Sequence, residues 1–288
     1  MYKFIVAAGL FLSIALLVSC GGSNDGGNTD GTAATEIDVN MPPITAGNWY
    51  RPPVSATWQW QLQSVINTTY VVDIYDVDLF DVPQATIDLL QAQGKKVICY
   101  FSAGSFEDFR ADAGQFNAAD LGKTLDGFAN ERWLDVRSQN VVDIMRARMD
   151  LAKQKNCDGV EPDNMDGFAN DSGFTLTADD QLAFNRLMAN EAHLRDLSVA
   201  LKNDLDQIPQ LVEYYDFSVN EQCHEFNECA VLTPFITAGK PVLNAEYQDK
   251  FVSNKAARDQ MCVDSIALKL SSLVLPLDLN DAFRISCL

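Results

Sequence analysis

Short apolar segments alternate with longer amphipathic segments along most of the chain. The short segments are rich in Val, Ile and aromatic residues, which is typical of parallel strands that are buried on both faces. Each of them is followed by a polar turn. We predict strands at residues 58–63, 71–77, 96–102, 158–162, 198–202, 217–221, 241–246 and 266–270.

The segments between these strands carry signals of helix starts and ends. Pro83 can occupy the first turn of a helix, and Gly94 can end it. Thr177 followed by Asp180 resembles a capping box, although Asp replaces the usual Glu or Gln. We predict helices at residues 83–94, 141–155, from 177 onward, 227–238 and 249–263.

The alternation of strands and helices predicts the fold class. Parallel strands joined by helices imply an α/β protein with right-handed crossovers. Eight such strands within residues 46–288 fit a (β/α)8 TIM barrel better than an open sheet. We therefore predict one (β/α)8 barrel domain over residues 46–288.

The first 45 residues differ from the rest in composition. Residues 1–19 combine a basic start with an apolar run shorter than the about 20 residues of a membrane span, which indicates a signal peptide. The run ends at Cys20 in a pattern that resembles the bacterial lipoprotein signal, where the cysteine carries the lipid. Residues 20–45, rich in Gly, Asn and Thr, predict a flexible tether. We expect an exported protein, either lipid-anchored to the cell envelope (the outer membrane in a diderm) or secreted.

The charge of the chain limits its partners. It has 40 Asp and Glu against 21 Lys and Arg, a formal net charge of −19. Such a surface repels phosphate backbones, so we expect no nucleic-acid partner, and it attracts polycations. With one strongly apolar run in the chain, a lipid anchor is the sole membrane contact that we expect. We also expect a monomer.

Six cysteines remain after Cys20, an even number that favours disulfides in an exported protein. Fifteen pairings are possible for six cysteines. We predict the short loop Cys223–Cys229, together with Cys99–Cys157 and Cys262–Cys287. No CxxC pair or His-rich cluster is present in the sequence, so we expect no zinc and no other cofactor.

Acidic residues gather where the predicted strands end. In a barrel the C-terminal ends of all strands open onto one face, where active sites lie. Pro162 ends the fourth strand and leaves Asp163 above it, while Glu221 and Glu246 end the sixth and seventh strands. The sequence lacks the ligand pattern of an EF-hand, a GxSxG elbow, a P-loop and a GxGxxG fingerprint. What remains is acid–base chemistry by paired carboxyls, as in glycoside hydrolysis.

Several motifs together resemble glycoside hydrolase family 114. They lie in order along the chain at residues 58–62, 75–78, 97–104, 131–135, 159–164, 201–203 and 220–223. The resemblance implies a (β/α)8 barrel with endo-α-1,4-polygalactosaminidase activity on a galactosamine-rich polymer, which is cationic where it is not acetylated. It also implies a retaining mechanism with Asp163 as nucleophile and Glu221 as acid/base, an order that the sequence leaves open.

The resemblance implies further site residues. Glu246 matches another acidic position, which could bind sugar or replace Glu221 in catalysis. The residues expected to line the substrate subsites are Asp76, Tyr100, Asn164, Lys202, Asn203 and Tyr247. Two alternatives stay open, a barrel that binds polysaccharide without cleaving it and a glycosidase of the same mechanism that acts on another glycan.

Overall fold

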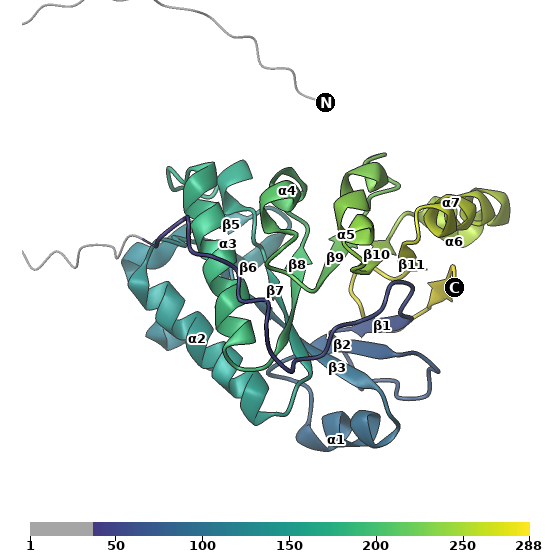
Figure 1. The fold of residues 1–288 in the computed structure, drawn as a ribbon, viewed down its shortest axis with the longest axis horizontal. Coiled ribbons are helices and arrows are strands. Elements are labelled where there is room, and N and C mark those ends of the chain that lie inside the picture. Colours follow the sequence, from purple (N-terminus) through teal and green to yellow (C-terminus); the bar gives the residue numbers. More distant parts are fainter. Residues whose placement is uncertain (1–36) are drawn as a thin grey trace, which may run out of the picture. The chain divides into compact units, whose positions relative to one another are not determined.

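The computed structural model describes residues 37–288, so the predicted signal peptide and Cys20 lie outside the described residues. A 9-stranded sheet runs in the order β1-β2-β3-β7-β8-β9-β10-β11-β12 (Figure 1). All neighbouring pairs are parallel except the last, in which β12 pairs with β11 antiparallel. The strands are β1 Trp58–Gln61, β2 Ile74–Asp78, β3 Lys96–Ser102, β7 Gly159–Asp163, β8 Ser198–Lys202, β9 Phe217–Glu221, β10 Val242–Glu246, β11 Ser271–Val274 and β12 Ile285–Ser286.

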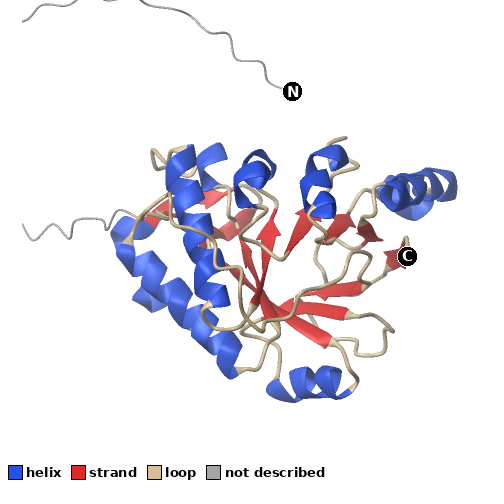
Figure 2. Ribbon diagram, viewed as in Figure 1, coloured by secondary structure: helices blue, strands red, loops and turns tan. Residues whose placement is uncertain are grey.

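The helices lie around the outer side of this curled sheet (Figure 2). The α-helices are α1 Gln84–Ala92, α2 Gln139–Gln154, α3 Ala178–His193, α4 Ile208–Leu211, α5 Thr233–Thr237, α6 Asp249–Ser253 and α7 Lys255–Ala267. Short 3-10 helices occur at η1 Ala113–Gln115, η2 Ala118–Asp120, η3 Gly167–Ala169, η4 Leu205–Gln207 and η5 Cys229–Leu232. The result is a mixed α/β fold.

The strand predictions hold for most of the sheet. The bounds of β3, β8 and β9 are those predicted, and the Thr177–Asp180 capping box opens α3. The eighth strand is an exception, because residues 266–270 form the end of α7 and a turn in which Lys269 has a φ of 60°. The strand itself begins at Ser271, one residue after the end of the predicted strand. The apolar residues that precede it were mistaken for the strand.

A second, 3-stranded sheet was not predicted. It has the order β4-β6-β5, with β4 Ser105–Glu107, β5 Leu121–Leu125 and β6 Phe128–Leu134, and it lies between β3 and α2 in the chain. Much of β5 and β6 is exposed, so these strands lack the apolar alternation by which the others are recognised.

Side chains along the large sheet alternate between two apolar clusters. Tyr75 and Val97 belong to a large cluster shared with the helices, which we call the outer cluster. Ile74 and Ile98, one residue away, belong to a smaller cluster built from β1, β2, β3 and β8 to β11, the inner cluster. Because side chains alternate with a period of two, polar residues in register with the inner cluster lie above it at the C-terminal strand ends.

Strand β1, at one edge of the large sheet, contacts β11 and the residues that follow β11 through individual hydrogen bonds. Within residues 37–288 no backbone ladder joins β1 to β11. Instead, Trp58 Nε1 donates to Ser271 O at 2.8 Å, and Arg284 Nη2 donates to Trp58 O at 2.7 Å. The backbone N of Leu62 also donates to Leu279 O at 3.0 Å. The eight parallel strands are confirmed, and these contacts form a seam in place of the ladder that would close a barrel.

Residues on both sides of the predicted boundary at residue 46 contact α3 and the segment before β9. The backbone N of Ile44 donates to Asn190 Oδ1 in α3 at 2.8 Å, and Trp49 Nε1 donates to Asp216 Oδ1 at 2.8 Å. Trp49 also stacks on His193, with ring centroids 4.0 Å apart. The last residues of the predicted tether therefore pack on the domain.

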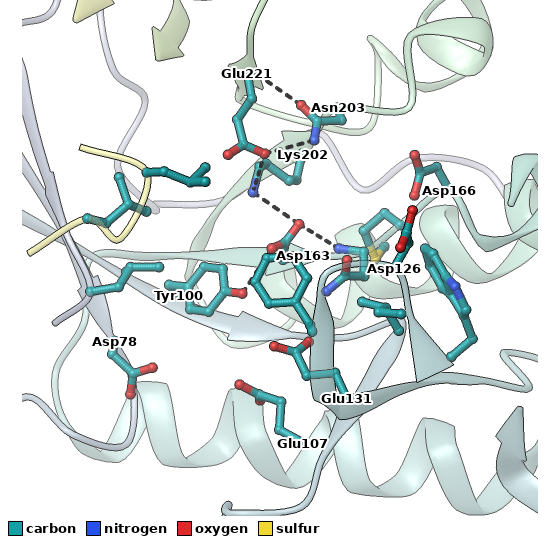
Figure 3. A pocket seen from close by; sticks show the side chains of 18 of the residues that line it. Asp78, Tyr100, Glu107, Asp126, Glu131, Asp163, Asp166, Lys202, Asn203 and Glu221 are labelled. Carbon is teal, nitrogen blue, oxygen red and sulfur yellow. Dashed lines mark hydrogen bonds and ion pairs between the residues drawn. The ribbon is translucent and has the colours of Figure 1, made fainter. Parts of the chain in front are cut away.

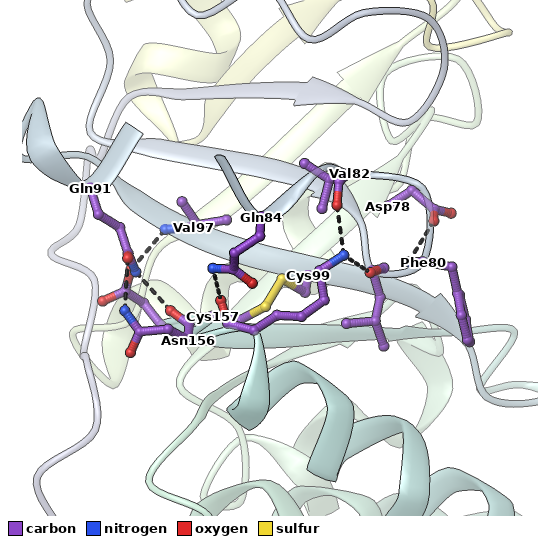
Figure 4. The surroundings of a disulfide bond; sticks show 12 residues. Asp78, Phe80, Val82, Gln84, Gln91, Val97, Cys99, Asn156 and Cys157 are labelled. Atoms are coloured by element: carbon purple, nitrogen blue, oxygen red, sulfur yellow. Dashed lines mark hydrogen bonds between the residues drawn. A yellow bond between two sulfur atoms is a disulfide. The ribbon is translucent and has the colours of Figure 1, made fainter. Parts of the chain in front are cut away.

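The structure contains three disulfides, Cys99–Cys157, Cys223–Cys229 and Cys262–Cys287, which are the predicted pairs. The first joins Cys99 of β3 to Cys157, which lies two residues before β7 (Figure 4). Strands β3 and β7 are neighbours in the sheet. Beside it, Gln91 Nε2 donates to Asn156 O at 2.7 Å, which ties α1 to the same turn. Among the described residues, no helix has the length and apolar character needed to cross a membrane.

Candidate active site

A cavity of about 1110 Å³ opens at the C-terminal ends of the parallel strands. Figure 3 shows carboxylates from several strands that converge around one lysine at its floor. The predicted site residues that line this cavity are Tyr100, Asp163, Asn164, Lys202, Asn203 and Glu221. Three of them, Asp163, Lys202 and Glu221, are the last residues of β7, β8 and β9, so the parallel sheet itself brings them together.

Asp163 is held by three donors. Its Oδ1 accepts from the backbone N of Asn164 at 2.6 Å and lies 3.0 Å from Lys202 Nζ, and its Oδ2 accepts from the Tyr100 hydroxyl at 2.9 Å. Burial and the charge of Asp163 raise the pKa of Tyr100 well above its usual range, so the phenol stays a donor. The three donors fix the orientation of this side chain, which is 16% exposed.

Glu221 is held by three groups as well. Its Oε1 accepts from the Tyr247 hydroxyl at 2.6 Å, and its Oε2 accepts from Asn203 Nδ2 at 3.1 Å and lies 3.4 Å from Lys202 Nζ. Burial, followed by the charge of Glu221, raises the pKa of Tyr247 well above its usual range. Tyr247 therefore positions Glu221 from below without being part of the cavity lining. Glu221 is 25% exposed, the more open carboxylate of the two.

Lys202 lies between the two carboxylates and is 2% exposed. Burial alone would lower its pKa, but the charges of Asp163, Glu221 and Glu161 outweigh burial and raise the pKa well above the usual range. The two oxygens nearest Lys202 Nζ can be no farther apart than the sum of their distances from it, 6.4 Å. One buried ammonium thus holds two acidic groups within a few ångströms of each other.

Beneath this layer lies a pair of fully buried carboxyls, Asp76 and Glu161. Lys202 Nζ is 3.3 Å from Glu161 Oε1. Burial raises the pKa of both groups, and the charge of Glu161 adds to the rise at Asp76, which disfavours the charged form of each. The Asp76 side chain points to the same face of the sheet as the site residues, but it is fully buried and does not line the cavity. The structure therefore does not place it against sugar.

Glu246 also lies away from the cavity. It has no exposed surface, and its Oε1 accepts from the backbone N of His224 at 2.8 Å and from Asn244 Nδ2 at 3.1 Å. The reason is strand parity, since Ala245 belongs to the inner cluster and its neighbour Glu246 points to the other face of the sheet. The structure therefore gives no support to Glu246 as a sugar ligand or a replacement for Glu221.

A glycine brings the loop after β3 against the loop after β7. The backbone N of Gly104 donates to Asp163 O at 3.0 Å. A Cβ atom added to Gly104 would lie 1.7 Å from Asn164 O, so only glycine permits this approach. Asn164 itself has a φ of 59°, in the left-handed region that Asn tolerates better than most residues. The two loops together fix the backbone that carries Asp163.

The second sheet supplies a wall of the cavity that sequence reasoning missed. Glu131 and Trp133 lie on the same face of β6 and both line the cavity. Two exposed rings, Phe109 and Phe128, line it as well, with 59% and 57% of their surface exposed. The family motif around residue 131 was the one sequence signal that pointed to this wall. Of the aromatic residues in the predicted strands, Trp60 and Tyr100 line the cavity.

The lining of the cavity is strongly acidic. Ten Asp and Glu residues line it against three cationic residues, Arg110, Lys123 and Lys202. Each of these cations is already paired, Arg110 with Asp78 at 2.6 Å and Lys123 with Asp171 at 2.6 Å. The cavity therefore presents unbalanced negative charge to a ligand.

Potential metal ligands were sought throughout residues 37–288. One group of three lies close together, Cys223, His224 and Cys229, with ligand atoms within 4.8 Å of one another. Because the two cysteines form a disulfide, they offer no thiolate to a metal ion.

Comparison with known proteins agrees with the resemblance noted in the sequence. A family model described as glycoside-hydrolase family GH114 matches residues 40–288. A crystal structure of Aspergillus fumigatus Ega3 in complex with galactosamine is similar, with 40% identity, a TM-score of 0.79, and coverage of 84% of this chain and 100% of that chain. No curated protein sequence matches significantly.

A more distant likeness concerns the fold alone. The glycoside hydrolase domain of PelA from Pseudomonas aeruginosa has 14% identity and a TM-score of 0.63, with coverage of 82% of this chain and 99% of that domain. The family model spans nearly all of the described residues, including both strand ends that carry Asp163 and Glu221. The chain thus belongs to glycoside hydrolase family 114 and is a glycosidase.

Proposed function

We propose that this protein is an exported endo-acting glycosidase that cleaves α-1,4-linked, galactosamine-rich polysaccharide with retention of configuration. The observation that carries the proposal is the position of Asp163 and Glu221 on either side of Lys202 in one open, acidic cavity. Two carboxyl groups that flank a glycosidic bond are what this reaction requires.

Asp163 is the nucleophile in this proposal and Glu221 the acid/base. Asp163 accepts from three donors, which fix the orientation of its oxygens, as a nucleophilic carboxyl requires. Glu221 is more exposed and lies farther from Lys202, which suits a group that gains and loses a proton. In the first step Glu221 protonates the leaving oxygen while Asp163 attacks the anomeric carbon. In the second step Glu221 takes a proton from the water that hydrolyses the glycosyl–Asp163 ester.

Retention is part of the proposal because the two carboxyls lie close together. Both contact the same Lys202 ammonium, at 3.0 and 3.4 Å, so their nearest oxygens are at most 6.4 Å apart. This limit is compatible with the about 5–5.5 Å separation of retaining enzymes.

Two observations support the substrate. The chain is 40% identical to a protein whose structure was solved with galactosamine. The cavity lining is rich in carboxylates, and non-acetylated galactosamine units carry a positive charge at neutral pH. Opposite charge would concentrate such a polymer at the cavity.

Export is part of the proposal. The three disulfides support a protein that matures in an oxidising compartment. Lipidation of Cys20 stays a prediction from the sequence, because this residue lies outside the described range. Mass spectrometry of the membrane-bound protein would detect an acylated cysteine at the mature N-terminus.

The catalytic assignment is tested with partly deacetylated α-1,4-galactosamine polymer. The wild-type enzyme should release oligosaccharides, and proton NMR of the first products should show the α-anomer. Asp163→Asn and Glu221→Gln should each lower kcat at least about 100-fold, while the exposed Asp88→Asn on α1, which makes the same charge change outside the cavity, should not. Cleavage that survives both site substitutions, or polymer binding without cleavage by the wild type, would contradict the proposal.

A further inference from the structure

Asp76 of β2 and Glu161 of β7, the pair of carboxyls beneath the catalytic residues, lack hydrogen-bond donors from their surroundings. Neither side chain has any exposed surface. In the described part of the chain, no other residue donates a hydrogen bond to any of their four oxygens. Buried polar atoms without a partner are rare because they are costly, so these two carboxyls must satisfy each other.

The two carboxyls are joined to each other. A side-chain hydrogen bond links Asp76 to Glu161, with the proton on Asp76 and Glu161 as the acceptor. Two charged carboxylates offer only acceptors, so this bond requires one proton between them. The pair therefore resembles the dyads in which two close carboxyls titrate as one unit.

The position of Lys202 agrees with this placement of the proton. Its Nζ lies 3.3 Å from Glu161 Oε1, whereas between residues 37 and 288 no Lys, Arg or His nitrogen lies within 4.0 Å of the Asp76 carboxyl. Burial raises the pKa of Asp76 well above its usual range and that of Glu161 to about 7. Above about pH 7, the pair therefore holds one proton, on Asp76, and one charge, on Glu161.

The remaining surroundings of the pair, within the described residues, are apolar or phenolic. The inner cluster, to which β1, β10 and β11 contribute, is apolar. Tyr100 and Tyr247 stay neutral because burial, together with nearby carboxylates that include Glu161, raises the pKa of both well above the usual range. The titratable and charged groups that act on the pair are Lys202, Asp163, Glu221, Tyr100 and Tyr247.

We propose that Asp76 and Glu161 are positioning residues for the reaction, which hold one proton in common and place a charge on Glu161 beneath Lys202. This charge keeps the acidic proton on Glu221 at neutral and alkaline pH. Neither residue of the pair lines the cavity, so both act through Lys202 and the catalytic carboxyls rather than on the sugar. The inference rests on the proposed function and extends it to the pH range of activity.

The charge on Glu161 opposes the loss of a proton from the layer above it. Besides burial and the opposing effect of Lys202, the charges of Asp163 and Glu221 raise the pKa of Glu161. Interactions between charges act equally in both directions, so a charged Glu161 makes it harder for the catalytic pair to ionise fully. Glu161 also balances the Lys202 ammonium, which would otherwise favour that ionisation.

The pH dependence of kcat/KM on the galactosamine polymer tests the role of the pair. Glu161→Gln removes the charge beneath Lys202, so the alkaline limb of the profile should move to lower pH by about one unit. The acid limb should stay, because Glu161 holds a proton there. Asp76→Asn keeps an uncharged donor to Glu161 and should move the alkaline limb less than half as far, and the exposed Asp88→Asn on α1 should leave the profile unchanged. An alkaline limb that stays in Glu161→Gln, or that moves as far in Asp76→Asn, would overturn the proposal.

Infrared spectroscopy locates the proton independently of activity. At about pH 8, the spectrum of Asp76→Asn should lack one protonated carboxyl of the wild type, whereas that of Glu161→Gln should lack one carboxylate. Loss of a carboxylate in Asp76→Asn would overturn the proposal, and this spectrum decides even where Glu161→Gln fails to fold. If the wild type cleaves no polymer, the proposed function is refuted instead, and the spectra still show where the proton lies.

Discussion

Replacing Lys202 by methionine should destabilise the protein in a way that depends on pH. Lys202 is buried and lies 3.0 Å from Asp163, 3.3 Å from Glu161 and 3.4 Å from Glu221. Methionine keeps much of the volume of the side chain but removes the ammonium. Three carboxyls would then share a buried layer with no compensating charge.

The magnitude follows from these distances. At an effective dielectric constant of about 20, each contact corresponds to about 5 kcal/mol of Coulomb attraction, which the desolvation of lysine offsets in large part. Removing one partner of a buried ion pair costs about 3–5 kcal/mol. We expect Lys202→Met to lower the free energy of unfolding by about that amount at pH 8.

The sign of the pH dependence can be worked out. Burial already raises the pKa of Glu161 to about 7, and without Lys202 this pKa rises further, because the attraction of the ammonium for the charged carboxylate is lost. A carboxyl with a raised folded pKa costs no stability below its unfolded pKa, and the cost grows as the pH rises through the interval between the two values. The loss should therefore be small near pH 4 and largest near pH 8.

Urea unfolding followed by tryptophan fluorescence at several pH values, with the disulfides intact, measures this difference. Lys123→Met provides the matched control, since the Lys123–Asp171 pair is exposed, with 58% and 82% of the side chains accessible. Such a surface pair contributes about 0–1 kcal/mol. A loss for Lys202→Met that does not change with pH, or that is no larger than in the control, would refute the reasoning.

Two further predictions concern the acidic residues. Raising sodium chloride from about 20 to about 500 mM should lower kcat/KM on the cationic polymer at least about tenfold with little change in kcat, because salt screens the cavity charges, and a rate that is independent of salt would argue against steering. Burial and the charge of Asp166 raise the pKa of Asp204 to about 8, so ionisation of this carboxyl destabilises the folded protein as the pH rises from about 4 towards 8. The free energy of unfolding of Asp204→Asn should exceed that of the wild type by about 2 kcal/mol at pH 8 and should equal it at pH 4. Asn also suits the left-handed φ of 47° at this position, and urea unfolding that is identical at both pH values would contradict the prediction.

The buried strands were the part of the fold most readily predicted from sequence. The bounds of β3, β8 and β9 follow from short Val- and Ile-rich runs between polar turns, because both faces of a parallel strand are covered. The sheet formed by β4, β5 and β6 could not be found this way, since its strands are largely exposed and carry Lys, Arg, Glu and Gly. Its shape depends on contacts with residues far along the chain, such as the bond from Lys123 N to Ser172 O.

The positions of the candidate catalytic residues could be predicted where the direction of the side chain and its depth in the sheet agreed. Asp163 and Glu221 are inward-facing residues at the ends of their strands, which places them at the cavity. Glu246 also ends a strand but faces outward, and Asp76 faces inward but lies one layer deeper. A shift of one residue in register reverses the face, and a single sequence does not fix register that finely.

The seam between β1 and β11 has a consequence for the order in which the chain folds. Its two side-chain bonds join residues 213 and 226 positions apart in the sequence, so they close loops that span nearly the whole domain. Closure of such long loops is entropically unfavourable until the intervening elements are in place. The seam should therefore form last, and until it forms the indole of Trp58, which is buried in the folded protein, stays accessible to solvent and to proteases.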